Sequence, residues 1–303
     1  MDLLQSLSEQ AAFINAEVIP WVLRLIMAGL GLSLTAADFR RVVLYPKAAT
    51  IGLLAQLIGL PLAAFGLAWA FNAPPAIAIG LVILAACPSG ATANAYTFYA
   101  KADVPLCVTL SAITSVVTVF TIPFLIGLAF ELFAAEQQSV TTSARNMLLS
   151  LITITLLPLA IGMAFRFFFR ELAERAVEPI RRSVLIIMII VLLLGVVSSY
   201  REILENFATA GTLVVVMNLL TMALGFGIAR LSGIPLTQVV TITFEVGVQN
   251  LALALAIAFN ILGRPELAIA GLIYAAVMPT TALIFVSFAR RMIENEARPA
   301  ATA

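Results

Sequence analysis

Long apolar stretches separated by short polar or charged segments run along almost the whole chain. A membrane-spanning helix needs about 20 mostly apolar residues, and nine stretches approach or exceed that length when their ends are set at prolines, glycines and charged residues. The pattern therefore predicts an all-α polytopic membrane protein with nine transmembrane helices. The expected spans are residues 19–37, 48–72, 76–100, 104–133, 144–168, 183–200, 208–230, 237–260 and 266–289.

Two of these spans are interrupted by polar residues near their middle. The segment Thr243–Asn250 places Glu245 between apolar runs, and an ionisable residue in such a position is by default a functional-site hypothesis. The segment Cys87–Asn94 contains Pro88 and Gly90, which favour a break because proline lacks a backbone donor and glycine loosens the chain. Broken helices persist in a membrane only where the freed backbone groups line a cavity or bind a ligand.

The two interruptions belong to a repeat with a fixed offset. Asn94 and Asn250 are 156 residues apart, and so are Pro123 and Pro279, which lie in the spans that follow the interruptions. Because the third and eighth spans are five spans apart, the two copies cross the membrane in opposite directions. This arrangement is typical of the inverted repeats of secondary transporters, whose two discontinuous helices cross near the membrane midplane and bind ligand and ion there.

Composition agrees with this pattern. Hydrophobic residues make up 62% of the 303 residues and charged residues only 11%, whereas a soluble domain carries about 25% charged residues. Membrane lipid is therefore the expected surrounding of the chain. The net charge of +1 indicates no nucleic-acid partner.

The distribution of basic residues predicts an orientation. If the loop after the first span is cytoplasmic, thirteen loop arginines and lysines lie inside and three lie outside. The positive-inside rule then places the N-terminus outside and the C-terminus in the cytoplasm of a cell (inner) membrane. The inner residues are Arg40, Arg41, Lys47, Lys101, Arg166, Arg170, Arg175, Arg181, Arg182, Arg230, Arg290, Arg291 and Arg298, and the outer ones are Arg145, Arg201 and Arg264.

Residue types that are absent or isolated narrow the chemistry. The chain has no histidine, which removes the commonest proton shuttle and metal ligand. Cys87 and Cys107 lie in apolar spans and belong to no metal-spacing motif. Residues 1–18 carry no basic run, so no cleavable signal peptide is expected. Arg24 is expected to extend to the outer membrane interface.

Glu245 has three interpretations. As a carboxylate near Gln56, Gln249 and unwound backbone carbonyls, it would supply the hard oxygen ligands that Na⁺ favours. As a protonatable acid it would carry H⁺, and as a structural residue it would complete a hydrogen-bond network. Asn94 and Asn250 carry both donors and acceptors, which suits them to pinning the crossing or to contacting a substrate's oxygens.

Polar side chains also follow one face of the fourth span. Cys107 and Ser111 are one helical turn apart, and Ser115 and Thr118 continue the same face. Such faces more often serve helix packing than ligand binding.

Three motifs resemble the bile acid:sodium symporter family. They are Met27–Leu34 with Asp38 and Phe39, Cys87–Asn94, and Glu245–Asn250, and with the span pattern the resemblance covers nearly the whole chain. It implies a single transporter unit, residues 1–303, in which a core domain with two crossed broken helices moves against a panel domain by alternating access. The implied panel helices are residues 19–37, 144–168 and 183–200, and the implied core helices lie within 48–133 and 208–289.

The resemblance also implies Na⁺ as the coupling ion, bound at two sites behind the crossing. The residues that match the first site are Gln56, Glu245, Val246, Val248 and Gln249, and this set is complete. The residues available for the second site, besides the shared glutamate, are Asn94, Cys107, Ser111 and Thr92. Ala93 stands where the family has a hydroxyl, and a thiol is a poor ligand for a hard cation. The second site is therefore weak or lost unless other oxygens, such as that of Thr92, compensate.

We therefore expect a secondary active transporter, not an enzyme, that couples Na⁺ to symport of an organic anion, either bile-acid-like or a small keto or hydroxy acid. The expected substrate contacts are Asn94, Asn250, Thr92 and Pro88. The alternatives are a proton-coupled carrier or an exporter of related fold that uses Glu245. Alternatives from other classes are an intramembrane enzyme, which would lack the usual hydrolytic apparatus, and a passive receptor or channel. A monomer is compatible with all of these features.

Overall fold

The computed structural model describes residues 2–35, 37–39, 42, 45–134, 143–198 and 200–297. Within these residues the ordered elements are helices, and the β-structure is one isolated bridge. In the described part, five helical stretches are long and apolar enough to cross a membrane, and three shorter apolar helices accompany them. The fold is therefore the all-α polytopic architecture that the sequence predicts.

The helical elements follow the predicted spans in order. They are α1 (Asp2–Ser33), α3 (Pro46–Leu54), η1 (Ala55–Gly59), α4 (Leu60–Ala70), α5 (Pro75–Ala86), α6 (Ala91–Tyr99), α7 (Val104–Phe133), α8 (Ala144–Leu151), η2 (Ile152–Leu156), α9 (Leu157–Phe168), α10 (Arg170–Ser198), α11 (Tyr200–Leu231), α12 (Leu236–Gly247), α13 (Leu251–Ala256), η3 (Ile257–Ile261), η4 (Pro265–Ala268) and α14 (Ile269–Ala297). The third predicted span is divided into α5 and α6, and the eighth into α12 and α13, so both interruptions are breaks in a helix.

Several helices extend beyond the apolar stretch that predicts them. α1 begins at Asp2 although the predicted span begins at 19, α10 begins at Arg170 and not at 183, and α14 continues to Ala297 and not to 289. The additional residues of α10 and α14 are rich in arginine and glutamate, which favour helix. Hydropathy marks only the part of a helix that crosses lipid, and the helix itself continues outside it.

Two spans contain a wider, π-helical turn directly before a proline. η1 precedes Leu60 and Pro61, and η2 precedes Leu157 and Pro158. Because proline has no N–H, the hydrogen-bond ladder loses a donor at these positions, and a wider turn accommodates the loss. In η1 this turn contains Gln56, the candidate polar residue of the second span.

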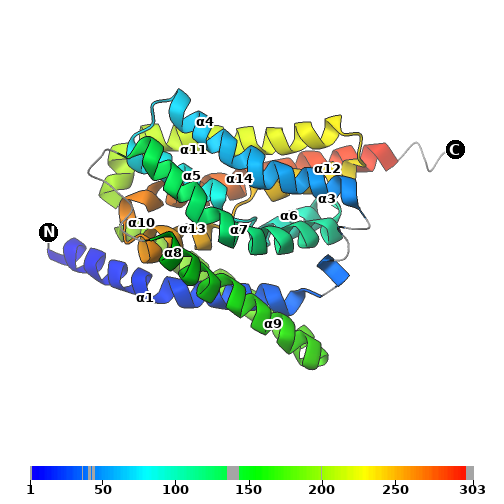
Figure 1. The fold of residues 1–303 in the computed structure, drawn as a ribbon, viewed down its shortest axis with the longest axis horizontal. Helices are drawn as coiled ribbons and strands as arrows, with labels where there is room; N and C mark the ends of the chain where they lie inside the picture. Colours follow the sequence, from blue (N-terminus) through cyan, green and yellow to red (C-terminus); the bar gives the residue numbers. More distant parts are fainter. Residues whose placement is uncertain are drawn as a thin grey trace.

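α1 packs along α9 and α10, and Figure 1 shows α1 and α9 crossing on one side of the other helices. The two helices approach closely because glycines face each other. A Cβ on Gly162 would overlap the Ala28 carbonyl, and Gly31 lies directly against Gly162. Arg166 of α9 also donates to the Leu32 carbonyl at 2.7 Å, which satisfies a carbonyl at the end of α1.

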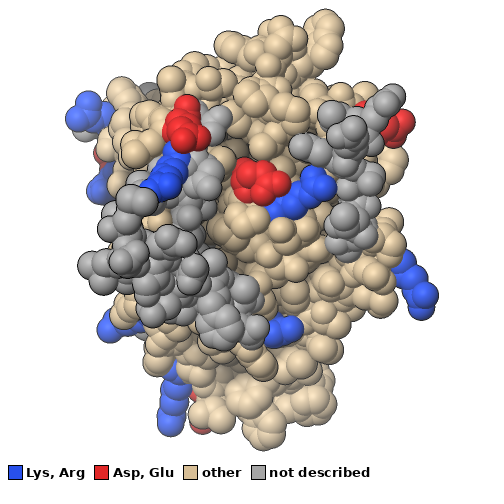
Figure 2. Space-filling model, turned by 90° about the vertical axis from the view of Figure 1, so that its left-hand side faces the viewer, with Lys and Arg blue, Asp and Glu red and all other residues tan. Residues whose placement is uncertain are grey.

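The remaining described helices surround the two breaks. α1 begins at the left of Figure 1 and α14 ends at the right, so the two ends of the described helical chain lie on opposite sides of the bundle. Figure 2 views the left-hand end, where the charged side chains among the coloured residues are few and scattered. Large apolar side chains such as Trp69 and Phe167 are exposed on the outside, which suits contact with hydrocarbon. Arg40, Arg41 and Arg298, part of the predicted orientation signal, lie outside the described residues.

Candidate functional site

The break between α5 and α6 lies beside the break between α12 and α13. The Gly90 N–H donates to the Val248 carbonyl at 2.9 Å, and the Asn250 N–H donates to the Pro88 carbonyl at 2.9 Å. The backbone groups freed by each break are thus partly satisfied by the other break, which meets the main requirement for irregular backbone inside a membrane. We call this paired region the crossover.

Ser89 and Gln249 oppose each other in an antiparallel bridge at the crossover, 160 residues apart. Asn94 and Asn250, which are 156 residues apart, therefore do not occupy equivalent places. The Asn250 side chain caps α13 by accepting from the Leu253 N–H at 3.1 Å, whereas Asn94 is the fourth residue of α6. The backbone pairing relates the two breaks more directly than the asparagines do.

Local sequence explains why the first break forms where it does. Pro88 has no N–H to offer to the preceding turn. Gly90 adopts extended backbone before α6, and a Cβ at this position would lie 3.0 Å from the Gln249 carbonyl oxygen. A larger residue would therefore push the two breaks apart.

Gln56 reaches the crossover from η1. Its Nε2 donates to the Cys87 carbonyl at 3.1 Å and to Gln249 Oε1 at 2.9 Å. Gln249 Nε2 donates in turn to the Val246 carbonyl at 2.7 Å. The Cys87 and Val246 carbonyls fix the orientation of the two side-chain amides. A carbonyl accepts a hydrogen bond only from the nitrogen of an amide and not from its oxygen. Gln56 Oε1 is consequently a buried acceptor without a hydrogen-bond partner among the described residues.

Glu245 lies in the last turn of α12 and is fully buried. Its carboxylate accepts from Ser111 Oγ at 3.0 Å and from Thr114 Oγ1 at 3.5 Å, both on α7. The Cys107 thiol lies 3.6 Å from Glu245 Oε2, and Ser89 Oγ lies 2.7 Å from Ser111 Oγ. Among the residues that the structure describes, no lysine or arginine pairs with Glu245.

The structure thus divides the candidate ion ligands between two groups. The amide cluster consists of Gln56, Gln249 and the carbonyls of Cys87 and Val246. The carboxylate cluster consists of Glu245, Ser89, Cys107, Ser111 and Thr114. The Glu245 side chain forms no hydrogen bond with either glutamine, although Val246, the next residue, joins the amide cluster through its carbonyl. The residues expected at the first sodium site are therefore divided. Glu245 lies in the carboxylate cluster, whereas Gln56, Gln249 and the Val246 carbonyl lie in the amide cluster.

The other candidates lie around these clusters. The Val248 carbonyl faces the opposite break, where it accepts from Gly90. The Asn94 Oδ1 atom is buried and has no hydrogen-bond partner in the described part of the chain. Thr92, in the first turn of α6, is exposed. Pro88 contributes its backbone carbonyl to the crossover.

Sequence reasoning missed two members of the carboxylate cluster, Ser89 and Thr114. Their hydroxyls could not be separated from packing hydroxyls by spacing alone. The structure separates them: Ser115 and Thr118 donate to carbonyls of their own helix at 2.7 Å each, whereas Thr114 also reaches the carboxylate of Glu245. The sequence did offer one indication for Thr114, because this residue lies three positions, or nearly one helical turn, after Ser111.

The chain matches the profile of the Sodium Bile acid symporter family over residues 20–229, a match that ends before α12. It is 34% identical over 237 residues to the uncharacterised sodium-dependent transporter YocS of Bacillus subtilis, covering 78% of this chain and 72% of that protein. It is 28% identical over 248 residues to the probable chloroplastic sodium/metabolite cotransporter BASS1 of Arabidopsis thaliana. That alignment covers 82% of this chain and 60% of the Arabidopsis protein.

A human relative has a narrower match. The chain is 28% identical over 123 residues to the human sodium-dependent organic anion transporter, covering 41% of this chain and 32% of that protein. The profile match extends over more than half of the chain and agrees with a helical fold that contains helices long and apolar enough to cross a membrane. The chain therefore belongs to the sodium bile acid symporter family and is a multi-pass membrane transporter, not an enzyme.

Proposed function

We propose that the protein is a sodium-coupled symporter of an organic anion. The observation that carries this proposal is the environment of Glu245, a fully buried residue that pairs with no lysine or arginine among the described residues. A carboxylate removed from water and left without a counter-charge is costly. A bound cation removes that cost, and the surrounding oxygen atoms favour a hard cation such as Na⁺.

Two further oxygens support a cation at the crossover. Gln56 Oε1 and Asn94 Oδ1 are buried acceptors that lack a hydrogen-bond partner within the described residues. Buried polar atoms are nearly always satisfied in native proteins, so such acceptors require an explanation. A bound cation would take these two oxygens as ligands. The acceptors would then be satisfied, and the cation would gain part of its oxygen coordination.

An organic anion is the substrate class that we propose. The relatives' names include a sodium/metabolite cotransporter and a sodium-dependent organic anion transporter. In this chain Asn94, Asn250, Thr92 and Pro88 lie at or near the crossover and would contact the substrate. α6 begins there without a side-chain cap, and the N–H groups in the first turn of a helix carry partial positive charge.

Alternating access would divide the helices as the family resemblance implies. In this proposal α1, α8, α9 and α10 form the panel, and the elements between α3 and α7 and from α11 to α14 form the core. The close packing of α1 on α9 and α10 supports a panel that moves as one body. We further propose an outer N-terminus and a cytoplasmic C-terminus in the cell membrane, following the basic residues of the loops.

Uptake into proteoliposomes tests the proposal. Radiolabelled keto acids, hydroxy acids and a bile acid are presented with external Na⁺, or with K⁺ in its place, at the same pH. Saturable accumulation that requires the Na⁺ gradient is expected for at least one anion. Accumulation that is undiminished in K⁺ would exclude sodium coupling.

A proton is the second candidate for the coupling ion, because H⁺ would also remove the charge of Glu245. Its specific support is that hydroxyl groups and a thiol, not charged groups, surround this carboxylate among the described residues. Glu245→Gln distinguishes the two ions. A proton carrier would lose the pH dependence of uptake together with its turnover, whereas a sodium carrier would lose its dependence on Na⁺.

A further inference from the structure

The Gly247 carbonyl, at the end of α12, is held by side chains from outside the crossover. Asn218 of α11 donates to it through Nδ2 at 2.9 Å, and Tyr274 of α14 donates its hydroxyl at 2.8 Å. Asn218 Nδ2 also donates to the Tyr274 hydroxyl at 3.0 Å. Thr281 of α14 donates to Asn218 Oδ1 at 2.5 Å. We call Asn218, Tyr274 and Thr281 the anchor residues.

The carbonyls on either side of Gly247 engage the crossover. Val246 accepts from the Gln249 side chain, and Val248 accepts from the Gly90 N–H. Val246 and Gly247 are the last two residues of α12, and Val248 is the first residue after it, with extended backbone at φ −124° and ψ 97°. The hydrogen bonds from Asn218 and Tyr274 direct the Gly247 carbonyl toward α11 and α14. Because planar peptide units join Gly247 to both neighbours, restraining this carbonyl also restrains the directions of the Val246 and Val248 carbonyls.

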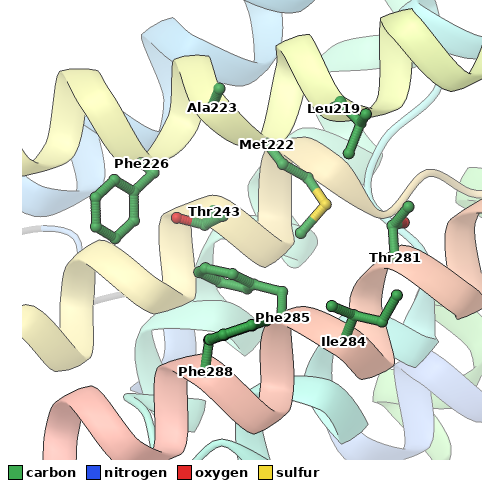
Figure 3. A pocket seen from close by; sticks show the side chains of 9 residues that line it. All are labelled: Leu219, Met222, Ala223, Phe226, Thr243, Thr281, Ile284, Phe285 and Phe288. Carbon is green, nitrogen blue, oxygen red and sulfur yellow. The ribbon is translucent and has the colours of Figure 1, made fainter.

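The anchor residues lie in surroundings that offer little polar competition. Figure 3 shows Thr281 of α14 and Met222 of α11 beside one cavity of about 320 Å³, whose other lining residues are apolar except Thr243. The Thr243 hydroxyl donates to the Val239 carbonyl of its own helix. Hydrogen bonds in such low-dielectric surroundings are strong, and an unpaired polar group there is costly. Thr281 lines this cavity, and Asn218 and Tyr274 are themselves almost completely buried, so the hydrogen bonds of the anchor residues form away from water.

We propose that Asn218, Tyr274 and Thr281 are positioning residues for the coupling ion. Their side chains form no hydrogen bond with the side chains of the amide cluster or of the carboxylate cluster. They act through Gly247, by orienting the Val246 and Val248 carbonyls toward the crossover. The proposal rests on the sodium-coupled function proposed above.

Thermal unfolding of the purified protein in detergent provides the test. Na⁺ is titrated against K⁺ at constant ionic strength, and the Na⁺ concentration at half of the maximal rise in unfolding temperature is measured. Tyr274→Phe and Thr281→Val each remove one hydroxyl and keep the side-chain size. Thr280→Val is the matched control, because the exposed Thr280 hydroxyl donates to the Ala276 carbonyl of its own helix and not to Asn218.

The two anchor variants are expected to need about threefold to tenfold more Na⁺, the equivalent of one net hydrogen bond, while Thr280→Val keeps the unmodified midpoint. Anchor variants that unfold at lower temperature but keep that midpoint would show a packing role only and overturn the proposal. If Tyr274→Phe does not fold, the Na⁺ midpoint of Thr281→Val alone tests the proposal. An unmodified protein without any Na⁺ response would overturn sodium coupling itself, and the positioning role with it.

Discussion

Gln56 Nε2 donates to Gln249 Oε1 at 2.9 Å, although the two residues are 193 positions apart in the chain. The bond joins the wide turn before Pro61 to the break between α12 and α13. Because Gln56 also donates to the Cys87 carbonyl, the same side chain contacts both breaks. An irregular turn in one span thus helps to hold two broken spans together.

The two glutamines are expected to be energetically coupled. Gln56→Leu or Gln249→Leu leaves buried partners unpaired, so each should lower the free energy of unfolding by about 1–3 kcal/mol. The double variant should cost less than the sum by about 0.5–1.5 kcal/mol, because its second change removes an already broken bond. Equilibrium unfolding of the four proteins in mixed micelles measures this coupling. Strictly additive losses would show that the amides do not interact.

Ser111 and Ser115 form a matched pair for testing the carboxylate cluster. Ser111 donates to Glu245 at 3.0 Å, whereas Ser115 donates to the Ser111 carbonyl at 2.7 Å. Ser111→Ala should raise the Na⁺ concentration for half-maximal uptake about threefold to tenfold, because one oxygen next to the carboxylate is lost. Ser115→Ala should leave it unchanged. Equal effects of the two substitutions would mean that the hydroxyls serve α7 packing alone.

Cys107 supplies a soft sulfur 3.6 Å from the Glu245 carboxylate. Cys107→Ser replaces it with an oxygen, which a hard cation prefers. The Na⁺ concentration at half of the maximal rise in unfolding temperature is therefore expected to fall. The decrease should be about threefold if the new oxygen contributes about 0.7 kcal/mol. Cys87→Ser is the control, since it keeps the backbone carbonyl that accepts from Gln56, and the buried Cys87 thiol is no part of the carboxylate cluster. A Cys107→Ser protein that binds Na⁺ no better would place the ion away from position 107.

The glycines between α1 and α9 are expected to be sensitive to added volume. Gly162→Ala would bring a methyl group onto the Ala28 carbonyl of α1, and a backbone atom cannot move aside as a side chain can. We expect a loss of about 1–3 kcal/mol in the free energy of unfolding. Gly66→Ala, where no atom lies within 4 Å of the new Cβ, should be neutral or stabilising by up to about 1 kcal/mol. Thermal unfolding in detergent compares them, and a tolerated Gly162→Ala would contradict the close packing.

The membrane fold and the places of both breaks could be predicted from the sequence because they depend on local physics. Apolar length marks a span, and Pro88 with Gly90 marks a break whatever surrounds it. Helix ends were less predictable, since α10 and α14 continue through charged residues that a hydropathy pattern excludes from a span. The 156-residue spacing identified two related breaks, but their register depends on backbone pairing between distant segments, which joins residues 160 apart.

The chemical character of the candidate site could be predicted better than the contacts between its side chains. Glu245 was identified by the cost of a buried charge, which needs no tertiary structure. Its partners on α7 depend on how that helix is rotated, so Thr114 could not be chosen over Ser115. Asn218 and Tyr274 gave no signal, because a single polar residue in an apolar span has many structural explanations. Their role becomes visible only at the Gly247 carbonyl, where α11, α12 and α14 meet.

Binding of radioactive sodium to the purified protein tests most directly whether Glu245 lies at the centre of a sodium site. Equilibrium dialysis compares the unmodified protein with Glu245→Gln and with Glu266→Gln, a control in which an exposed glutamate is changed. Saturable Na⁺ binding that K⁺ does not displace is expected in the unmodified protein and in Glu266→Gln. It should be lost or weakened at least about tenfold in Glu245→Gln, because a charged ligand is removed from a buried site. Absence of saturable binding in the unmodified protein, or full binding by Glu245→Gln, would contradict a sodium site built on this carboxylate.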